Sequence, residues 1–352
     1  MAILHKPAVA FPEEVVTLEQ TLAVAEQLHA GNPDLELALR LIRNTGVETR
    51  NIVQPLEVAL RHPGFEERNL VHRREAEHYV PIVVAEALAN AGKTPSDIDV
   101  IIYVSCTGFM MPSMTAWMIN ELGFQPSTSQ LPIAQLGCAA GGAAIARALD
   151  FCRAHPGANA LIVACEFCSL CYQPTDIAVG TLLSNGLFGD AVAAVVVSDE
   201  VSPGDVGIEL RRNASYLIPG TTEWISYAVR ATGFHFQLDK RVPGTMEPLA
   251  PVLRTVSEQE GWDAGLLDFY IVHAGGPRIL DDLSKYLDVA PNQFRYSRET
   301  LTKHGNIASA VVLDAMRRLF EDPDNPKIGR GIIAGFGPGI TAEISLGEWV
   351  TP

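Results

Sequence analysis

Short apolar runs alternate with helix-like segments along most of the chain, and glycines and prolines separate them. The runs Asp99–Ser105, Leu161–Cys165 and Ala191–Val197 have the length and composition of strands that are buried on both faces. A strand-like stretch at Leu131–Leu136 precedes Ala139–Arg153, which is rich in Ala, Ile and Leu and has a helical pattern. Strands that alternate with helices in this way predict an α/β fold.

The second half of the chain repeats this order of elements. A strand-like run at Asp268–His273 is followed by a helical pattern at Pro277–Leu287. A further helix is predicted over Ile307–Phe320, and a strand over Gly331–Ala334. The repetition suggests that the two halves are related.

Three landmarks recur with nearly the same offset in the two halves. Cys106 in the first half corresponds to His273 in the second, Cys138 to Asn306, and Phe167 to Phe336, at separations of 167 to 169 residues along the sequence. This favours a duplicated α/β unit, although short apolar patterns also coincide by chance. The polar stretch 198–205, which contains Pro and Gly, is the best candidate for a junction. We therefore expect one half over residues 1–200 and a second half over 201–352.

Cys138 lies between a predicted strand and a predicted helix, in a segment of small residues. A thiol there would point at unpaired backbone N–H groups, and the positive end of the helix dipole favours its thiolate. The same position also suits a buried cysteine that only packs against the helix. Taken alone, the residue leaves a nucleophile and a structural side chain as equal alternatives.

His273 ends an apolar strand, and Asn306 follows a glycine at the start of a predicted helix. Imidazole can pair with a thiolate or donate to an oxygen that gains charge, and an amide can donate without acting as a base. Each residue also has a simpler explanation, as a structural histidine and as a helix N-cap. Equivalent strand ends of related halves converge, which would bring Cys138, His273 and Asn306 together. His304 is close to Asn306 in the sequence, and we interpret it as a surface neighbour.

Composition and charge exclude several classes of function. Apolar residues make up 47% of the 352 residues and charged residues 19%, which is typical of a folded globular chain. The formal net charge of −15 argues against general binding to nucleic acid or to an anionic membrane surface. No apolar run reaches the length of a membrane helix, and the first residues lack the apolar core of a signal peptide. We therefore expect a cytoplasmic protein with no nucleic-acid or membrane partner.

Six cysteines are too few for a disulfide scaffold. Cys165, Cys168 and Cys171 are spaced by three residues, which raises the possibility of a metal site. No nearby histidine would complete a tetrahedron around such an ion, so we predict that these cysteines bind no metal.

Six ordered motifs give the chain a resemblance to a known family. They are Gln135-Leu-Gly-Cys-Ala-Ala-Gly-Gly142, Leu187-Phe-Gly-Asp190, Val242-Pro-Gly244, His273-Ala-Gly-Gly-Pro277, His304-Gly-Asn306 and Gly335-Phe-Gly-Pro-Gly339. In their order and spacing the chain resembles the type III polyketide synthases, the chalcone-synthase-like family, from about Arg43 to Glu343. The resemblance implies a thiolase-like fold of five layers, αβαβα, built from two duplicated halves, and a homodimer. It also implies CoA thioesters as substrates, with no metal, flavin or nicotinamide cofactor.

The catalytic cysteine, histidine and asparagine of this family match Cys138, His273 and Asn306. By this likeness Cys138 is acylated by a starter thioester and then holds the growing chain. His273 and Asn306 donate to the thioester carbonyl of malonyl-CoA and stabilise the enolate that remains when carbon dioxide departs. An arginine that contacts CoA phosphates in the family resembles Arg50.

Further positions match residues of the family's substrate cavity. They are Cys106, Cys168, Cys171, Phe188, Tyr227, Phe236 and Ala308, together with Met111, which matches a residue that reaches into the partner subunit's cavity. Phe188 and Phe236 match two gatekeeping phenylalanines, whose apolar rings exclude water from the carboxylate that is lost. Tyr227 stands where plant-type enzymes have a glycine, and its bulk narrows the pocket against an aromatic starter. Without the resemblance, ordinary core packing would explain the two phenylalanines and the cavity thiols equally well.

Within the family the chain is most similar to the bacterial enzymes that make 1,3,6,8-tetrahydroxynaphthalene from malonyl-CoA alone. We therefore predict an acyltransferase that condenses five malonyl-CoA units and cyclises the pentaketide to that product. Three alternatives stay open. They are a type III polyketide synthase that makes pyrones or resorcinols from an acyl-CoA starter, a ketoacyl-carrier-protein synthase III, and a thiol-based redox sensor or binding protein that uses Cys106 and Cys138.

Overall fold

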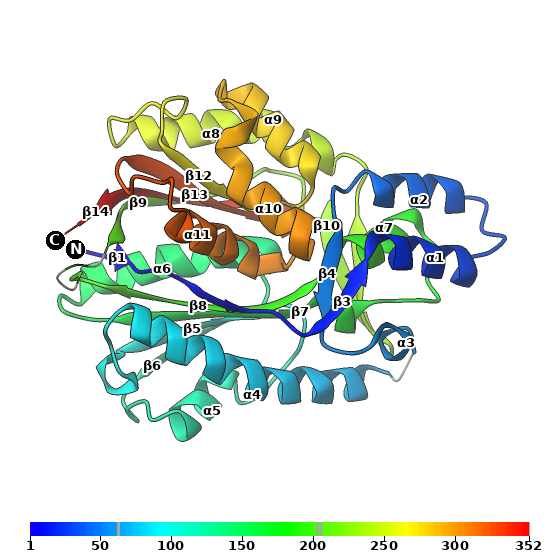
Figure 1. Ribbon diagram of the computed structural model, residues 1–352, viewed down its shortest axis with the longest axis horizontal. Coiled ribbons are helices and arrows are strands. Elements are labelled where there is room, and N and C mark those ends of the chain that lie inside the picture. Colours follow the sequence, from blue (N-terminus) through cyan, green and yellow to red (C-terminus); the bar gives the residue numbers. More distant parts are fainter. Residues whose placement is uncertain (62–63, 202–203, 205, 352) are drawn as a thin grey trace.

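The structure is a computed structural model that describes residues 1–61, 64–201, 204 and 206–351. Within these residues the chain is a mixed α/β protein, as the apolar pattern predicts (Figure 1). Three residues of the predicted junction, at positions 202, 203 and 205, lie outside the described part. None of the described helices combines the length and the apolar character that crossing a membrane requires.

A ten-stranded mixed sheet forms the centre of the molecule. In spatial order its strands are β12 (Phe269–Val272), β13 (Arg330–Gly337), β14 (Thr341–Val350), β9 (Gly207–Leu217), β1 (Ile3–Leu4), β8 (Asp190–Ser198), β7 (Ala160–Phe167), β5 (Val100–Val104) and β6 (Ser129–Ile133), and β2 (Ala8–Ala10) pairs with β8 beside this path. The pairs β5–β6, β5–β7 and β12–β13 are parallel. The short strand β1 joins β8 to β9, so the sheet has two wings, a lower one from β8 to β6 and an upper one from β9 to β12.

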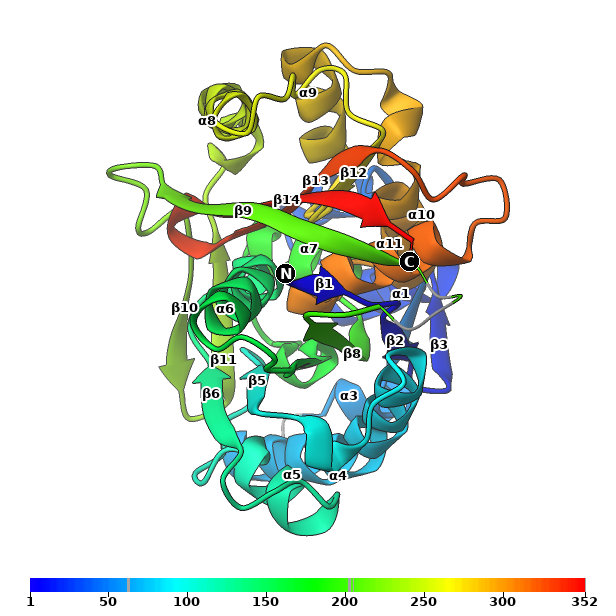
Figure 2. The same ribbon diagram turned by 90° about the vertical axis from the view of Figure 1, so that its left-hand side faces the viewer.

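Two helices lie between the wings of the sheet. α6 (Ala140–Ala154) and α11 (Val311–Glu321) each contact strands of both wings (Figure 1, Figure 2). Most residues of α6 are buried, and its Ala and Gly content follows from this position, because a helix packed on two sides has little exposed surface. The apolar strands β5, β7 and β8 are likewise buried on both faces.

The remaining helices cover the outer faces of the wings. α4 (Phe65–Asn90) and α5 (Met114–Glu121) pack on the lower wing. α8 (Met246–Glu258), α9 (Pro277–Leu287) and α10 (Arg295–His304) cover the upper wing (Figure 1). Both chain ends lie at the same side of the molecule, beside β1 and β14 (Figure 2).

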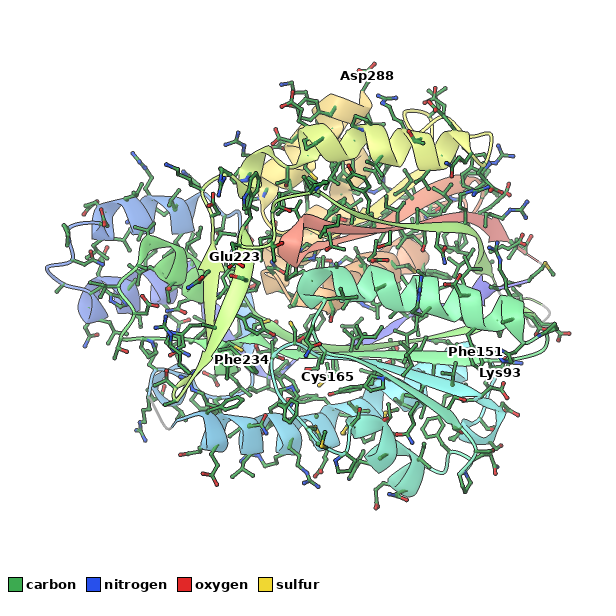
Figure 3. The ribbon with its side chains drawn as sticks, turned by 180° about the vertical axis from the view of Figure 1, so that it is seen from behind. Lys93, Phe151, Cys165, Glu223, Phe234 and Asp288 are labelled. Carbon is green, nitrogen blue, oxygen red and sulfur yellow. The ribbon has the colours of Figure 1, made fainter. Side chains whose placement is uncertain are left out.

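A group of smaller elements gathers at the opposite end of the sheet from the chain ends (Figure 1). They are β3 (Glu14–Thr17) paired with β4 (Thr49–Ile52), the helices α1 (Leu18–Leu28), α2 (Leu35–Arg43), α3 (Leu56–Ala59) and α7 (Val179–Leu187), and the hairpin of β10 (Ile225–Arg230) and β11 (Gly233–Leu238). Seen from behind, the hairpin stands across this end of the sheet, with Glu223 just before it and Phe234 on its second strand (Figure 3).

The bounds of the predicted helices are confirmed in one case and wrong at one end in another. α9 has the predicted bounds, Pro277–Leu287. The helix predicted from Ile307 instead starts as a 3₁₀ turn at Ala308–Ala310 and becomes α-helical only at Val311. The physical reason is the φ angle of 48° at Ala308, which lies in the left-handed region and interrupts a right-handed helix.

The cysteines form no cross-links. All six are free thiols in the structure. Within the described part of the chain, no group of three or more histidine, cysteine or acidic side chains is placed to hold a metal ion.

Candidate active site

A cavity of about 530 Å³ lies at the end of the sheet where the hairpin stands, and most of its lining is apolar. Ten of the twelve site residues expected from the sequence line it: Cys106, Cys138, Cys168, Cys171, Phe188, Tyr227, Phe236, His273, Asn306 and Ala308. The two others, Arg50 and Met111, do not line this cavity. The fold therefore brings together residues that are up to about two hundred positions apart in the sequence.

Cys138 sits in a 3₁₀ turn, Gly137–Ala139, directly before α6. Gly137 has φ of 50°, and a Cβ there would come within 2.7 Å of the Pro338 ring. A Cβ on Gly142 would meet the carbonyl oxygen of Glu343 at 2.7 Å and the nitrogen of Gly335 at 2.8 Å. The two glycine-rich motifs thus let α6 approach β13 and β14 closely, and this close approach fixes the position of Cys138.

Asn306 is held at both its backbone and its amide. Its N–H donates to the carbonyl of Leu187 at 2.9 Å, and its own carbonyl accepts from Gly189 at 3.1 Å. The side-chain Oδ1 accepts the Ala308 N–H at 3.0 Å, so the amide nitrogen is left as the free donor. A hydrogen bond from the Asn306 side chain favours the thiolate of Cys138 and lowers its pKa. This contact joins the first and last members of the expected triad.

His273 follows β12 and is 3% exposed. Its ring shares a hydrogen bond with the backbone of Ala308, the residue that also binds Asn306. Its Nδ1 has no hydrogen-bond partner in the described part of the chain. A Cβ on the cavity-lining Gly275 would lie 3.5 Å from Nε2. Ala308, strained at its positive φ, thereby positions both donors.

Burial keeps the thiol and the imidazole of this site neutral. It raises the pKa of Cys138 to about 12, with a further increase from the Glu166 carboxylate, against the lowering by Asn306 and by the residue's own backbone N–H. It lowers the pKa of His273 to about 4. The backbone N–H at the helix start favours the thiolate, as the sequence predicts, but desolvation of the charged form outweighs this donor. At neutral pH the site holds a thiol and a neutral base.

Glu166 is a residue of this region that the sequence reasoning missed. Its carboxylate is fully buried and accepts from the Cys106 N–H at 3.0 Å, the Thr107 hydroxyl at 3.0 Å and the Ser309 hydroxyl at 2.5 Å. Burial raises its pKa, and its charge raises the pKa of Cys138. The signal was present as a carboxylate at the end of the apolar run of β7, because buried acids are rare unless they are bonded.

Aromatic rings form one wall of the cavity. Phe188 and Phe236 meet edge to face, with ring centroids 5.3 Å apart and an angle of 77° between their planes. Tyr227 lies directly opposite Phe236 in the β10–β11 hairpin, and its ring is tilted by 53° against that of Phe234, with centroids 5.0 Å apart. The Tyr227 hydroxyl donates to the Cys106 carbonyl at 2.8 Å. The ring is therefore fixed across the pocket.

Arg50 is wrong as the predicted contact to CoA phosphates. It is 2% exposed, and its guanidinium is already used by internal acceptors. It donates to the Tyr172 hydroxyl, to the carbonyls of Asn185 at 2.6 Å and Phe188 at 3.0 Å, and to the Thr21 hydroxyl at 2.7 Å. A buried guanidinium with these partners cannot turn outward to a phosphate. Its contact with Phe188 instead supports the aromatic wall.

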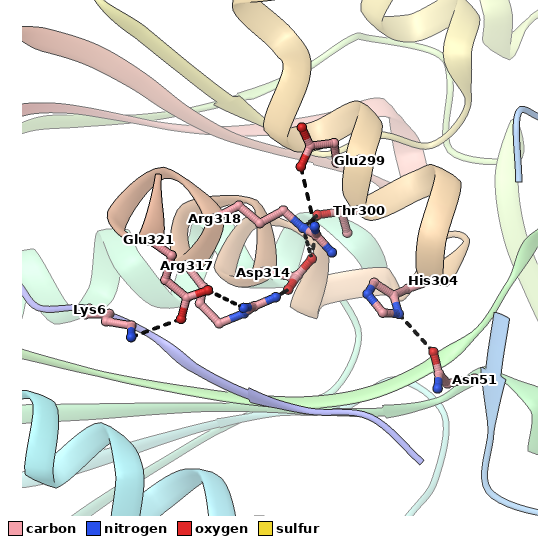
Figure 4. Close-up of polar contacts among 9 residues, drawn as sticks. All are labelled: Lys6, Asn51, Glu299, Thr300, His304, Asp314, Arg317, Arg318 and Glu321. Atoms are coloured by element: carbon pink, nitrogen blue, oxygen red, sulfur yellow. Dashed lines mark hydrogen bonds and ion pairs between the residues drawn. The ribbon is translucent and has the colours of Figure 1, made fainter. Parts of the chain in front are cut away.

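His304 is not the surface residue that we expected. Its ring stacks on Phe11 with centroids 3.6 Å apart, and its Nδ1 is 2.9 Å from Oδ1 of Asn51 (Figure 4). Burial lowers its pKa to about 4. His304 therefore packs the segment before Asn306 against the N-terminal part of the chain.

The segment after Asn306 is held by a buried carboxylate on α11. Asp314 is fully buried and accepts from the Thr300 hydroxyl of α10 at 2.6 Å (Figure 4). Arg317 and Arg318 donate to the same carboxylate at 2.7 and 2.8 Å. These contacts connect α10 with α11, and the loop that carries Asn306 runs between the two helices.

Comparison with known proteins gives one family along the chain. The models of the N-terminal and C-terminal domains of chalcone and stilbene synthases match residues 8–201 and 209–349. A 1,3,6,8-tetrahydroxynaphthalene synthase of Streptomyces coelicolor is 66% identical over 351 residues, which cover 100% of this chain and 93% of that protein. A phloroglucinol synthase of Pseudomonas fluorescens is 45% identical over 99% of both chains. The crystal structure of the tetrahydroxynaphthalene synthase of Streptomyces coelicolor, a bacterial type III polyketide synthase, has a TM-score of 0.97 at 65% identity and covers 99% of this chain and 100% of that chain.

Proposed function

This chain belongs to the chalcone and stilbene synthase family of type III polyketide synthases, and from that premise we propose that it makes 1,3,6,8-tetrahydroxynaphthalene from malonyl-CoA. It is an acyltransferase that joins five malonyl units, with loss of five carbon dioxides overall, and cyclises the pentaketide. The observation that carries the proposal is the meeting of Cys138, His273 and Asn306 in one apolar cavity. The 66% identity to a synthase of this product supports the choice of product.

We propose that the fold is the five-layered thiolase-like arrangement of two duplicated halves, 1–200 and 201–352. The placing of α6 and α11 between the wings, with further helices outside, supports the five layers (Figure 2). The matched positions of Cys138 before α6 and Asn306 before α11 support the duplication.

Cys138 is the nucleophile in this proposal. The neutral His273 takes the proton from its thiol as Sγ attacks the carbonyl of the starter thioester, and CoA leaves as its thiolate. The imidazolium then returns the proton to the departing sulfur. Because burial lowers the pKa of His273, the imidazole is unprotonated at neutral pH and its ring has a nitrogen lone pair that can accept a proton.

His273 and Asn306 next act as donors to a second malonyl-CoA. Its thioester oxygen gains negative charge as carbon dioxide leaves, and the free amide nitrogen of Asn306 is placed to donate to it. The edge-to-face pair of Phe188 and Phe236 keeps water from the carboxylate and favours its loss as a neutral gas. The enolate carbon then attacks the acyl carbonyl on Cys138, the bond from that carbonyl carbon to Sγ breaks, and Sγ leaves as a thiolate. The lengthened chain is then a CoA thioester, which Cys138 can take up again.

Tyr227 selects malonyl-CoA as the starter as well as the extender. Its hydroxyl is anchored to the Cys106 carbonyl, so the ring stays across the pocket and leaves little room for an aromatic starter. The thiols of Cys106, Cys168 and Cys171 line the space that the growing chain enters. Burial raises the pKa of these thiols and that of Cys138 alike, so Cys138 differs from them by the hydrogen bond from Asn306, which lowers its pKa.

We further propose a homodimer in the cytoplasm. Met111 is 86% exposed, on the loop that follows Cys106 and Thr107 of the cavity wall, and a partner subunit would cover it. Six free thiols without a disulfide suit a reducing compartment.

Product analysis tests the proposed function. We expect the purified protein to convert malonyl-CoA, supplied as the only thioester, to tetrahydroxynaphthalene or its oxidation product flaviolin, detected by mass spectrometry. Cys138→Ala should give neither product. Phloroglucinol from malonyl-CoA, pyrones or resorcinols that need a fatty acyl-CoA, or activity only with a malonyl carrier protein would each replace this proposal by another condensing activity.

A further inference from the structure

The lining of the cavity contains a single formally charged side chain. Among the described residues that line it there is no lysine, aspartate or glutamate, and Arg278 is the one arginine. Arg278 and Asn44 are also the exposed members of this lining. They therefore mark the opening of the cavity to solvent, with Arg278 on α9 and Asn44 at the end of α2.

The guanidinium of Arg278 is available at this opening. Its side chain is 70% exposed, and its one ion pair in the described part of the chain joins Nε to Asp282 at 3.5 Å, one turn further along α9. Exposed pairs of this kind contribute little stability, so the side chain can exchange this partner for a stronger one. This distinguishes Arg278 from Arg50, whose guanidinium is committed to the interior.

The path from the opening to the reacting groups runs along the segment between His273 and Arg278. Five residues can span at most about 17 Å when fully extended, which is of the same order as an extended pantetheine arm. Two of them are glycines that leave this path clear. A Cβ on Gly275 would meet His273 and the Ile279 side chain, whereas Gly276 has no heavy atom within 4 Å of its Cβ position.

We propose that Arg278 binds a phosphate group of the CoA thioester at the opening of the cavity. The inference rests on the proposed function, since it takes a CoA thioester as the ligand. A chain with a net charge of −15 repels a polyanion at long range and needs a local cation to hold one. Guanidinium is suited to this because it presents paired donors to phosphate oxygens. The malonyl carboxylate is a worse partner, since it must lie beside Phe188 and Phe236 at the reacting end.

Comparison of two substrates tests the assignment. Malonyl-CoA and malonyl-pantetheine share the thioester and the carboxylate, but the second has no phosphate. We expect Arg278→Gln to raise KM for malonyl-CoA about tenfold and to leave kcat within about twofold. KM for malonyl-pantetheine should stay within about twofold. Arg278→Lys, which keeps the charge, should stay within about threefold of the wild type on malonyl-CoA.

Arg298→Gln is the matched control. Arg298 lies on the neighbouring helix α10, forms an ion pair with Asp281 of α9 at 2.5 Å and does not line the cavity. It should leave both KM values unchanged. An unchanged KM for malonyl-CoA in Arg278→Gln, or an equal rise for both substrates, would overturn the phosphate contact. A wild-type protein that releases no product from malonyl-CoA would instead overturn the proposed function, so the two failures are distinct.

Discussion

At the scale of single residues, Asn306 shows how a neutral amide can serve two charges in succession. Its Oδ1 is occupied by the Ala308 N–H, so its amide nitrogen must donate into the site. That donor first favours the thiolate of Cys138 and later an enolate oxygen on the substrate. The first of these interactions exists without substrate, and it can be measured directly.

We predict that Asn306→Ala raises the pKa of the Cys138 thiol by about one unit, because a hydrogen bond to a charged group contributes about 1.5–3 kcal/mol and relaxation of the cavity recovers part of it. Alkylation of Cys138 by iodoacetamide at pH 8 should then be about tenfold slower. Asn306→Asp should slow it further, since a carboxylate would stand beside the thiolate. Mass spectrometry of the Cys138 peptide separates this reaction from those of the other cavity thiols.

Asn185→Ala is the matched control, because Asn185 lines the same cavity and its hydrogen bond to Arg50 is made by the backbone carbonyl, which the substitution keeps. Its alkylation rate should equal that of the wild type. Equal or faster alkylation of Cys138 in Asn306→Ala would show that the amide does not stabilise the thiolate.

At this scale the sequence predicts which side chains lie together where a motif contains them. It does not predict whether an arginine outside such a motif is buried or exposed. The motifs predict that Cys138, His273 and Asn306 lie together, and the structure places them around one cavity. Arg50 was misassigned because an arginine in a loop has the same sequence signature whether it meets solvent or buried carbonyls. The exposure of Arg278 at the cavity opening could not be predicted either, since it is a property of the fold.

At the scale of elements, the contact between α6 and the strands β13 and β14 determines where Cys138 lies. Gly142 on the helix and Gly335 on the strand bring backbone against backbone. A side chain at Gly142 would meet the Glu343 carbonyl and the Gly335 nitrogen, neither of which can rotate away as a flexible side chain does. The helix would have to move, and the turn that carries Cys138 would move with it.

We predict that Gly142→Ala destabilises the protein by about 1–3 kcal/mol, the usual range for overpacking a tight core. It should also lower product formation well beyond the fraction unfolded, because the Cys138 sulfur shifts relative to Asn306. Denaturant unfolding and initial rates at a temperature where the variant is folded measure the two effects separately.

Gly244→Ala provides the comparison, since a Cβ at Gly244 has no heavy atom within 4 Å and its φ is not positive. It should leave the stability within about 0.5 kcal/mol of the wild type. If both glycine variants were equally stable, the close approach of α6 to the strands would not determine the position of the thiol.

The sequence predicted elements where a single periodicity dominates and missed them where the surroundings decide. The apolar runs of β7 and β8 and the amphipathic α9 are recognisable because each buries a regular set of positions. The start of α11 was misplaced, because the left-handed Ala308 is imposed by the loop around Asn306. The two-winged shape of the sheet was not predicted either, since it depends on the two-residue strand β1.

At the scale of the whole molecule, exposed apolar side chains gather at one edge of the lower wing. Phe109 is 59% and Met111 86% exposed, on the loop that follows β5. β6 is the last strand of the sheet, runs parallel to β5 and is mostly exposed, with Leu131 at 38%. Because parallel strands end at the same edge, the loop and the end of β6 form one surface. An open apolar edge of this kind is normally covered by another chain.

We predict that the protein is a dimer through this surface, with twice the mass of one chain in light scattering after size exclusion. Met111→Glu should weaken the dimer at least about 30-fold, because a carboxylate at the centre of an interface must lose its water.

Leu266→Glu is the matched control, as Leu266 is 80% exposed but follows α8, on the outer side of the upper wing. A monomeric wild type, or a dimer that both variants leave intact, would mean that another surface or no partner covers this edge. Because the loop of Met111 continues from Cys106 and Thr107 in the cavity wall, dissociation should also change the product pattern.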